Sequence, residues 1–497
     1  MGLFLRKVAT PSGATSVQIV EKRDGVRTIV EHIGSAHTRE ELAALTQIGQ
    51  DKIHGDQLAL DLGHDDGTAA GSGQPTVVGS ASRVLWQTLE AAYAQLGFNI
   101  VGDDVFKKLV LARMIEPASK ADTIRVLNEI GVAAPSLRTI WRTLARCVAR
   151  DWRDAICNAA FAHATADGSL SLCLYDVTTL YFEAENEDTF RKVPMSKERR
   201  VDPQIVVGML VTATGFPLDI ASFTGNTAET RTLVPVLESF RERYRVDELT
   251  VVADAGMLSA SNLNALEDAG FSFIVGSRIS KAPYDLAEHF ERHGTFFRDG
   301  QILESTRVMG TATAARERRV VYHYSWKREK RDNRTLTKQI ERAEAIADGD
   351  RPVKKDRFVN LSGKQPGVDW DRVEQARQLL GLKGYVTNMA AEKLDGYQVV
   401  SAYHELFQVE RSFRMAKTDL RARPMFHHQR DSIEAHLTIV FTALAVSRHL
   451  QERTGMSIRR IVQALRPLRD VTINISGHHV TATTPPTGDA AEILAHL

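Results

Sequence analysis

The chain has 497 residues, of which 43% are hydrophobic and 25% are charged, and this composition excludes a disordered or fibrous protein. A chain of this length predicts several domains, and the net charge of +1 excludes an overall basic excess, so any contact with nucleic acid must depend on local clusters. No apolar run is long enough to span a membrane, the three cysteines form no metal-binding pair, and no apolar segment follows Arg6 and Lys7. We therefore expect a cytoplasmic protein without membrane contact.

Residues 1–62 are predicted to form a small module of a β-hairpin and a helix. Apolar and polar residues alternate over 15–33 with a turn signal at the centre, which is typical of two antiparallel strands. Thr38 and Glu41 have the spacing of a capping box that opens a helix. Residues 63–80 are predicted to be a linker, because much of this stretch is rich in Gly, Ser, Ala and Asp.

Residues 81–168 are predicted to form a helical domain, because apolar residues recur at helical spacing throughout. The segments Lys120–Ile130 and Ser136–Leu144, with a short glycine-containing break between them, resemble a helix-turn-helix. Arg138 and Arg142 would then lie one turn apart on the outer face of the second helix. Helix pairs joined by glycine are also common in plain bundles, so this pair either binds a DNA end or is purely structural.

Residues 169–280 alternate predicted strands and helices, which is typical of an α/β fold. The first strand is predicted over 171–182, where the apolar run is nearly continuous, as in a strand covered on both faces. Further strands are predicted over 205–212, 217–222, 249–253 and 271–276, and helices over 230–240 and 259–269. This region is predicted to be the first part of the core.

The chain after residue 280 is predicted to interrupt this core and then complete it. Residues 281–380 mix short β runs, a charged helix and polar loops, and are predicted to be an inserted domain. Residues 381–455 are predicted to return to the core through a strand and two helices, the first over 401–420. Residues 456–497 are predicted to hold a helix, a short β pair and a loose tail.

Three local clusters of basic residues contrast with the nearly neutral total charge. They are Arg191, Lys192, Lys197, Arg199 and Arg200; Lys327, Arg328, Lys330, Arg331 and Arg334; and Arg459, Arg460, Arg466 and Arg469. One such cluster is usually a solvated face, but the three together are compatible with nucleic-acid binding. Trp326, beside the second cluster, is either a core residue or a platform on which a base stacks.

Two aspartates lie in or after predicted strands. Asp176 lies within the strand over 171–182, on a face of mostly apolar residues, and Asp254 directly follows the strand over 249–253. Ligand sites in open α/β sheets gather at the carboxyl ends of strands. Each aspartate alone also has an ordinary explanation, which is a backbone or arginine contact for Asp176 and turn formation for Asp254.

Glu410 is predicted to face inward from its helix. It belongs to a set spaced three or four residues apart, which comprises Tyr403, Leu406, Phe407, Glu410, Phe413, Arg414 and Lys417. Most glutamates on helices face water, so a glutamate in line with apolar residues requires a metal, a cation or a proton.

Three carboxylates, Asp176, Asp254 and Glu410, would supply hard oxygen ligands. Mg²⁺ fits them best, because it accepts one or two carboxylates together with phosphate oxygens, and we expect Mn²⁺ to substitute. Two such ions would activate the attacking oxygen and stabilise the leaving oxygen in an in-line displacement at phosphorus. Lys417 is expected either to hold a DNA phosphate or to be an ordinary surface lysine.

Three segments resemble, in order, the DDE transposases of bacterial insertion sequences. They read Asp-Val-Thr-Thr-Leu-Tyr-Phe-Glu at 176–183, Asp-Ala-Gly-Met at 254–257, and Tyr-His-Glu-Leu-Phe-Gln-Val-Glu-Arg-Ser-Phe-Arg-Met-Ala-Lys at 403–417. Each motif alone is weak, and their order over about 170–450 gives the resemblance its strength.

The third segment is similar to the Tyr-x2-Arg-x3-Glu-x6-Lys signature of one group within that family. Tyr403, Glu410 and Lys417 match the signature positions, and the resemblance implies that Tyr403 and Lys417 contact DNA. Leu406 stands where the signature has arginine, so any DNA contact of that arginine would have to come from Arg411 or Arg414.

The resemblance implies an RNase H-like catalytic core with a mostly β insertion between the second and third acids. It implies that Asp176, Asp254 and Glu410 are the catalytic and metal-binding residues. It also implies double-stranded DNA as the partner, both the terminal inverted repeats and the target, and a homodimer in the synaptic complex. The chemistry would be metal-dependent nicking followed by attack of the freed 3′-hydroxyl.

Two alternatives share the same residues. One is an RNase H-like nuclease that cuts without strand transfer, which a strand-transfer assay with a pre-cleaved end would separate from a transposase. The other is a non-catalytic DNA-binding protein derived from a transposase, for which the loss of one acid would be the mark. All three candidate acids are present.

Overall fold

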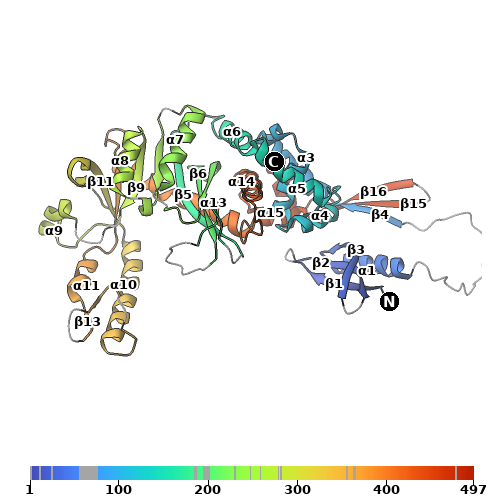
Figure 1. Ribbon diagram of the computed structural model, residues 1–497, viewed down its shortest axis with the longest axis horizontal. Helices are drawn as coiled ribbons and strands as arrows, with labels where there is room; N and C mark the ends of the chain where they lie inside the picture. The colour runs from blue at the N-terminus through green and yellow to red at the C-terminus, as the bar shows by residue number, and fades with distance from the viewer. Residues whose placement is uncertain are drawn as a thin grey trace, which may run out of the picture. The chain divides into compact units, whose positions relative to one another are not determined.

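The computed structural model describes most of the chain and divides it into two compact units (Figure 1). The described residues are 3–10, 13–23, 26–54, 76–168, 170–183, 187–193, 202–228, 231–246, 248–257, 259–277, 279, 283–353, 356–361, 365–475 and 478–497. The first unit comprises Met1–His163 and Arg414–Leu497, and the second comprises Ala164–Phe413. The glycine-rich part of the expected linker, up to residue 75, lies outside the described residues. No helix in the described ranges is long and apolar enough to cross a membrane.

The amino-terminal module of the first unit is a three-stranded antiparallel sheet covered by one helix. Its elements are β1 (Leu3–Ala9), β2 (Thr15–Arg23), β3 (Val26–Ala36) and α1 (Arg39–His54). The predicted hairpin is confirmed as β2 and β3, and β1 is an additional strand. The capping box is also confirmed, because Thr38 Oγ1 accepts from the Glu41 backbone N–H at 3.1 Å and the Glu41 carboxylate accepts from the Thr38 N–H at 3.4 Å.

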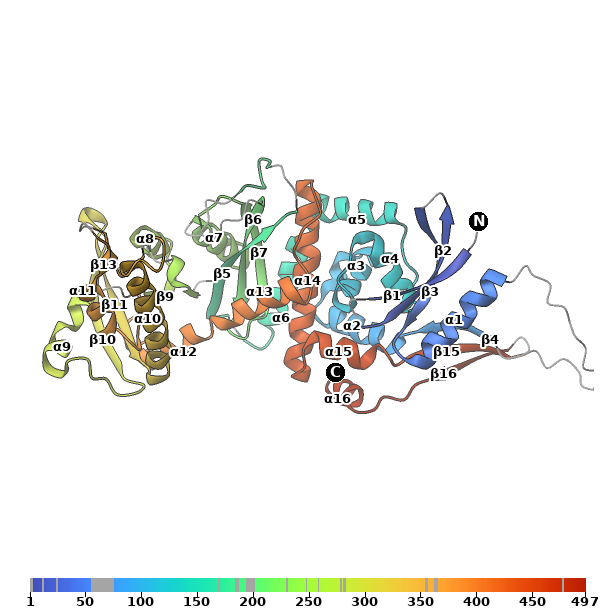
Figure 2. The same cartoon turned by 90° about the horizontal axis from the view of Figure 1, so that it is seen from below.

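Most of the rest of the first unit is helical, as predicted for residues 81–168. The helices are α2 (Arg83–Gln95), α3 (Asp104–Ile115), α4 (Lys120–Glu129), α5 (Leu137–Ala149), α6 (Trp152–Ala164), α14 (Arg430–Thr454) and α15 (Ile458–Leu465). Helix α14 packs against α2, α3 and α5 (Figure 2). Its residues from 435 to 450 are all buried, and most of those in the middle of this stretch are apolar.

Helix α14 corrects one predicted domain boundary. Residues 381–455 were expected to form the second part of the α/β core, but those from Arg414 onward group with the helical unit. An apolar helix carries no signal in its own sequence that says which of two cores will bury it.

A second three-stranded sheet corrects the predicted linker and tail. Strand β4 (Thr76–Ala81) pairs with β15 (Asp470–Ile475), which pairs with β16 (His478–Thr483), so residues 76–80 are not part of a linker. The partner of β4 lies almost the whole chain away, so no local pattern reveals the pairing. The expected loose tail contains helix α16 (Asp489–His496), which buries Ile493.

The second unit is built on an eight-stranded mixed sheet of order β10-β11-β14-β9-β8-β5-β6-β7. The strands are β5 (Leu172–Tyr181), β6 (Gln204–Thr212), β7 (Pro217–Thr224), β8 (Thr250–Ala253), β9 (Ser272–Ser277), β10 (Ile302–Met309), β11 (Arg316–Tyr324) and β14 (Leu382–Thr387). Strands β5, β8 and β9 are parallel, and all other neighbours are antiparallel. The parallel connections run through α7 (Leu233–Tyr244) and α8 (Ala260–Asp268), as parallel pairing requires. The α/β fold expected for residues 169–280 is thus confirmed.

The segment predicted to be a mostly β insertion is organised differently. Strands β10 and β11 extend the central sheet, and helix α10 (Trp326–Ala347), with 22 residues, is longer than these strands of 8 and 9 residues together. Helix α10 packs with α11 (Trp370–Arg377) and the short pair β12 (Val359–Asn360) and β13 (Gly367–Val368) around a small core of its own (Figure 1). That core contains Leu336, Ala343, Ile346, Phe358, Val359 and Val373.

Candidate functional site

Asp254 directly follows the carboxyl end of β8, and Asp176 lies beside it in the middle of β5, just after the part of β5 that pairs with β8. In the pairing of β5 with β8, Tyr175 is opposite Ala253. The next residue is Asp176 after Tyr175 and Asp254 after Ala253, so the two aspartates are neighbours. Asp176 is half-buried and Asp254 is exposed. We call this pair the acidic edge. The sequence placed each aspartate correctly in or after its strand, and the parallel register brings the two together.

Tyr403 contacts the acidic edge from α12 (Gly396–His404). Its hydroxyl donates a hydrogen bond to Asp254 Oδ1 at 2.9 Å. Burial and the neighbouring Asp254 raise the pKa of Tyr403 well above the ordinary phenol range. Tyr403 therefore remains a neutral donor throughout the physiological pH range and fixes one oxygen of Asp254.

Gly276 on β9 makes this approach of Tyr403 sterically feasible. Ala253 on β8 is opposite Val275, so Gly276 stands next to Asp254 at the same edge. A Cβ atom on Gly276 would lie 2.4 Å from the Tyr403 hydroxyl oxygen, which is too close for any side chain. Gly276 thus allows the tyrosine to lie across β9.

Glu410 lies on a second helix, which corrects the prediction of one helix over 401–420. Helix α12 ends at His404, and α13 (Phe407–Thr418) begins after a turn at Glu405 and Leu406. Glu410 is exposed and does not face inward as predicted, because the break rotates the apolar stripe. The buried residues of the region are Leu406, Val409, Ser412, Phe413, Met415 and Ala416.

Glu410 lies between two anchors that fix this part of the chain on the sheet. The first anchor is the contact of Tyr403 with Asp254. The second is the Ser412 hydroxyl, which donates to the Gly215 carbonyl at 2.7 Å in the turn between β6 and β7. That turn is at the amino end of β5, because Thr212 pairs with Cys173. The segment from Tyr403 to Ser412 therefore runs from the carboxyl end of the parallel strands toward their amino end.

The donor atoms of the acidic edge fit a divalent cation in part. Two adjacent carboxylates are hard oxygen ligands of the kind that Mg²⁺ and Mn²⁺ take in proteins. Within the described ranges, no three or more His, Cys, Asp or Glu side chains gather closely enough to hold a metal ion. Asp176 and Asp254 are thus brought together, and Glu410 is not yet within reach of them.

The positions around Glu410 explain the departure from the signature. Leu406, which replaces the signature arginine, is buried and packs in the core. Arg411 and Arg414 are exposed on α13, and Lys417 is half-buried two turns beyond Glu410 on the same helix. The position of Leu406 therefore serves packing, and the exposed cations of this helix are its arginines.

The basic cluster at 327–334 forms the first turns of α10, which begins at Trp326. The pKa of His404 on α12 is lowered first by burial and then by the charge of Arg328. Arg328 therefore lies near α12. Lys327 and Lys330 are exposed, and the Lys330 ammonium lies 3.6 Å from the centre of the Trp326 ring. Trp326 is 54% exposed, so it is not a core residue.

Two histidines beside Arg328 were not anticipated from the sequence. The rings of His323 and His404 are 6.0 Å apart at a steep angle. The pKa of His323 is lowered by burial and then by His404 and Arg328. The two residues are about 80 positions apart in the sequence, so only the pairing of β11 with the rest of the sheet could have revealed the contact.

The remaining predicted cations are divided between exposed and paired positions. Arg138 and Arg142 are exposed on α5, whose amino terminus is capped by Ser136 as predicted. Arg191 is paired with Asp188, and Arg460 is paired with Asp489. Arg466 is buried between Glu116 and Glu129 and therefore has a structural role. Three further members of the first cluster, Lys197, Arg199 and Arg200, lie outside the described residues.

Comparisons with known proteins identify one family. A family model described as "Transposase DDE domain" matches residues 168–446, which is more than half of the chain and contains all three candidate acids. Among solved structures, the chain resembles a cryo-EM structure of the piggyBac transposase synaptic complex with hairpin DNA, at 11% sequence identity and a TM-score of 0.36, over 76% of this chain and 70% of that chain. No curated protein matches the chain.

Proposed function

Because this chain belongs to the family of transposase DDE domains, we propose that it is the DNA transposase of an insertion sequence and that Asp176, Asp254 and Glu410 form its catalytic centre. The reaction would be strand cleavage at terminal inverted repeats, followed by transfer of the freed 3′-hydroxyl into target DNA. The observation that carries the proposal is the register of β5 and β8, which places Asp176 beside Asp254 at the carboxyl end of β8. Such strand ends are where α/β sheets bind ligands.

Asp176 and Asp254 would hold a divalent cation, Mg²⁺ or Mn²⁺, and Glu410 would complete the set. When bound, such ions lower the barrier to in-line displacement at phosphorus by polarising the attacking and leaving oxygens. The exposed position of Glu410 on α13 leaves its carboxylate open to solvent and to DNA. A change of its rotamer or of the helix on DNA binding is the step that would bring it to the acidic edge.

Tyr403 would act as a positioning residue in this centre. Its hydroxyl occupies one oxygen of Asp254, so the other oxygen is directed away from the tyrosine. A hydrogen bond of this kind to a ligating carboxylate fixes the orientation of the ligand. The raised pKa of Tyr403 keeps the proton in place, so the contact persists at neutral and mildly alkaline pH.

The DNA would be bound by cations outside the acidic edge. Arg328 lies near α12, since its charge affects the pKa of Tyr403 and His404, and Lys327 and Lys330 continue the cluster on α10. Lys417, Arg411 and Arg414 would contact phosphates along α13, and Arg138 and Arg142 along α5. The partner is double-stranded DNA, and the active assembly would be a homodimer that joins two ends.

The proposal is tested with a DNA duplex carrying the element's terminal repeat and a pre-cleaved version of the same end. With Mg²⁺ present, the wild type should nick the first substrate and insert the second into a target plasmid. Glu410→Gln should do neither while binding the duplex normally. Glu405→Gln, a matched change on the turn before α13, should behave as the wild type.

Three results would contradict parts of the proposal. Cleavage of the first substrate without insertion of the second would indicate a nuclease. Binding without any Mg²⁺-dependent cutting by the wild type would indicate a non-catalytic DNA-binding protein. Full cleavage by Glu410→Gln would remove that residue from the centre.

A further inference from the structure

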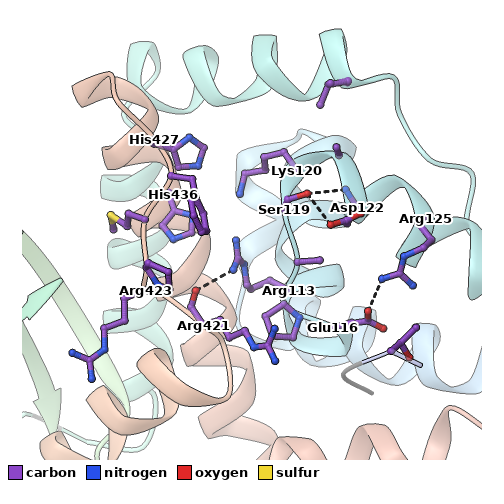
Figure 3. A pocket seen from close by; sticks show the side chains of 18 of the residues that line it. Arg113, Glu116, Ser119, Lys120, Asp122, Arg125, Arg421, Arg423, His427 and His436 are labelled. Atoms are coloured by element: carbon purple, nitrogen blue, oxygen red, sulfur yellow. Dashed lines mark hydrogen bonds and ion pairs between the residues drawn. The ribbon is translucent and has the colours of Figure 1, made fainter. Parts of the chain in front are cut away.

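A cavity of about 710 Å³ lies within the first unit, where the end of α3, the start of α4, the 421–427 loop and α14 meet (Figure 3). Its size is within the range of small-molecule sites. Seven side chains that can carry positive charge line it, namely Arg113, Lys120, Arg125, Arg421, Arg423, His427 and His436. We call this cavity the basic pocket.

Lys120 is the most unusual residue of the basic pocket. Its side chain points into the cavity in Figure 3, and the residue is only 8% exposed. In the part of the chain that the structure describes, its ammonium group has no hydrogen bond or ion pair. An unpaired buried cation is costly, and burial followed by the neighbouring Arg113 lowers the pKa of Lys120 well below its ordinary value.

Arg113 adds a second buried cation without a carboxylate partner among the described residues. Its guanidinium donates to the backbone carbonyls of Leu420 at 3.2 Å and Arg421 at 3.3 Å. It is also 8% exposed. Carbonyl oxygens satisfy two of its donors but do not neutralise its charge, so the field of Arg113 extends into the cavity.

The acids that line the same cavity are held by other partners. Glu116 forms ion pairs with Arg125 and Arg466. Asp122 accepts one hydrogen bond at the start of α4, from the Ser119 hydroxyl at 3.0 Å, and its own backbone N–H donates to that hydroxyl. These contacts leave the positive charge of Arg113 and Lys120 uncompensated.

The pKa values of His427 and His436 show the effect of the same positive charges. The rings of His427 and His436 are 5.3 Å apart, and Nδ1 of His436 is buried with no hydrogen-bond partner among the described residues. The pKa of His427 is lowered to about 4, first by burial and then by Lys120 and Arg113. The pKa of His436 is lowered well below its ordinary value by the same causes. An anion in the cavity would reverse these electrostatic contributions.

We propose that the basic pocket binds a phosphate group. A phosphate supplies several acceptor oxygens and up to two negative charges, which match the unpaired amino group of Lys120 and the charge of Arg113. The amino terminus of α4, a helix of 10 residues, begins at Lys120 and adds the positive end of its dipole. Neutral ligands would leave the two buried cations uncompensated.

The source of the phosphate that the surroundings favour is a DNA strand, and this part of the inference rests on the proposed function. Trp141 and Phe426, which are 46% and 67% exposed, line the same cavity and offer apolar faces to a sugar or a base. Trp141 lies on α5 between the exposed Arg138 and Arg142. A strand that lies along α5 could therefore place one phosphate in the pocket.

The first experiment uses inorganic phosphate and the full chain without DNA. At constant ionic strength and neutral pH, millimolar phosphate should raise the Tm of the wild type by about 2–4 °C relative to chloride. Lys120→Met should abolish this rise. Lys108→Met, which removes a lysine paired with Asp104 at 2.8 Å on α3, should retain it. An equal response of Lys120→Met and the wild type, or no response of the wild type, would overturn the phosphate site.

A second measurement does not depend on any variant. Nuclear magnetic resonance of the His427 ring should show its pKa rising by at least about one unit on phosphate addition, because an added anion favours the charged ring. An unchanged His427 titration in the presence of phosphate would overturn the site even if Lys120→Met proved unstable.

The third measurement identifies the source of the phosphate. The slope of log K for DNA binding against log salt concentration should be smaller by about 0.9 in Lys120→Met than in the wild type and in Lys108→Met. Equal slopes would overturn the DNA strand as the source and leave a free phosphate compound. Glu410→Gln should respond to inorganic phosphate as the wild type does, so a failure of the proposed catalytic centre is distinguishable from a failure of the basic pocket.

Discussion

The acidic edge of the second unit and the basic pocket of the first unit each gather like charges, but they differ in burial and in origin. Asp176 is half-buried and Asp254 is exposed, so water reduces the repulsion between their carboxylates. Lys120 and Arg113 are each only 8% exposed, so their repulsion is stronger and shifts the pKa of every ionisable neighbour with which they interact. Both arrangements require a partner of opposite charge, a cation in one case and an anion in the other.

The comparison shows that a substitution should affect the free energy of unfolding differently in the two regions. At the acidic edge, removing one carboxylate should leave the fold intact and would remove one of the proposed metal ligands. In the basic pocket, removing one cation relieves an unfavourable burial and should leave the folded state as stable or more stable. Variants of the two regions therefore separate effects on chemistry from effects on stability.

The largest expected effect is at the acidic edge itself. Asp254→Asn should lower DNA cleavage more than about 100-fold, because even groups one contact removed from a metal ligand change activity 10- to 100-fold. DNA affinity and Tm should remain those of the wild type. Asp268→Asn, an exposed aspartate at the end of α8 in the same unit, is the matched control and should keep full activity.

Tyr403→Phe should give the next largest effect. It removes the hydrogen bond to Asp254 but keeps the ring that packs 4.8 Å from the Tyr385 ring. We expect cleavage to fall about 10-fold, with a higher Mn²⁺ concentration needed for half-maximal rate. A loss of stability with an unchanged Mn²⁺ requirement would mean that Tyr403 acts through packing alone.

Gly276→Ala tests the same contact from the opposite side. The added methyl would overlap the Tyr403 hydroxyl, so either the tyrosine or β9 must move, at a cost of about 1–3 kcal/mol in the free energy of unfolding. Urea denaturation measures this cost. Wild-type stability together with wild-type cleavage would show that Tyr403 does not need its present position.

The smallest effect concerns the pH dependence of the basic pocket. The His427 ring takes up a proton near pH 6.5 when the chain is unfolded and near pH 4 when it is folded. The unfolded state therefore binds more protons between these values, so this contribution to stability is complete above pH 6.5 and is lost as the pH falls toward 4. His427→Gln should remove about 1 kcal/mol of the stability difference between pH 7 and pH 5, a value reduced because the ring is partly open to solvent.

Denaturation at pH 7 and pH 5 tests this prediction for the basic pocket. Denaturation curves of wild type and His427→Gln at both pH values give the difference directly. Identical pH dependence in the two proteins would mean that the ring is not held in its neutral form by the pocket.

Much of the acidic edge was predictable because its signals are local. The strand around Asp176, the strand before Asp254 and the capping of α1 and α5 each depend on a short window of sequence. Their order along the chain also carried the family resemblance. The exposed position of Glu410 was not predictable, since a two-residue turn between α12 and α13 rotates the helix face without interrupting the apolar spacing.

The basic pocket was not predictable, because its residues come from distant segments. Lys120 begins a helix that the sequence placed correctly, yet its burial depends on packing against residues about 300 positions later. The sequence did not predict that β4 pairs with β15 or that α14 packs in the helical unit, for the same reason. Apolar periodicity shows that a segment will be buried, but the partner that buries it is a property of the folded chain.

Binding of Mn²⁺ to the full chain in complex with a pre-cleaved DNA end tests the central claim most directly. Electron paramagnetic resonance of the free ion gives the affinity without requiring any reaction. The account predicts that Asp176→Asn and Asp254→Asn each weaken Mn²⁺ binding at least about 10-fold, whereas Asp268→Asn leaves it unchanged. Equal Mn²⁺ affinity in the wild type and in both acidic-edge variants would contradict the assignment of Asp176 and Asp254 as the metal-binding pair.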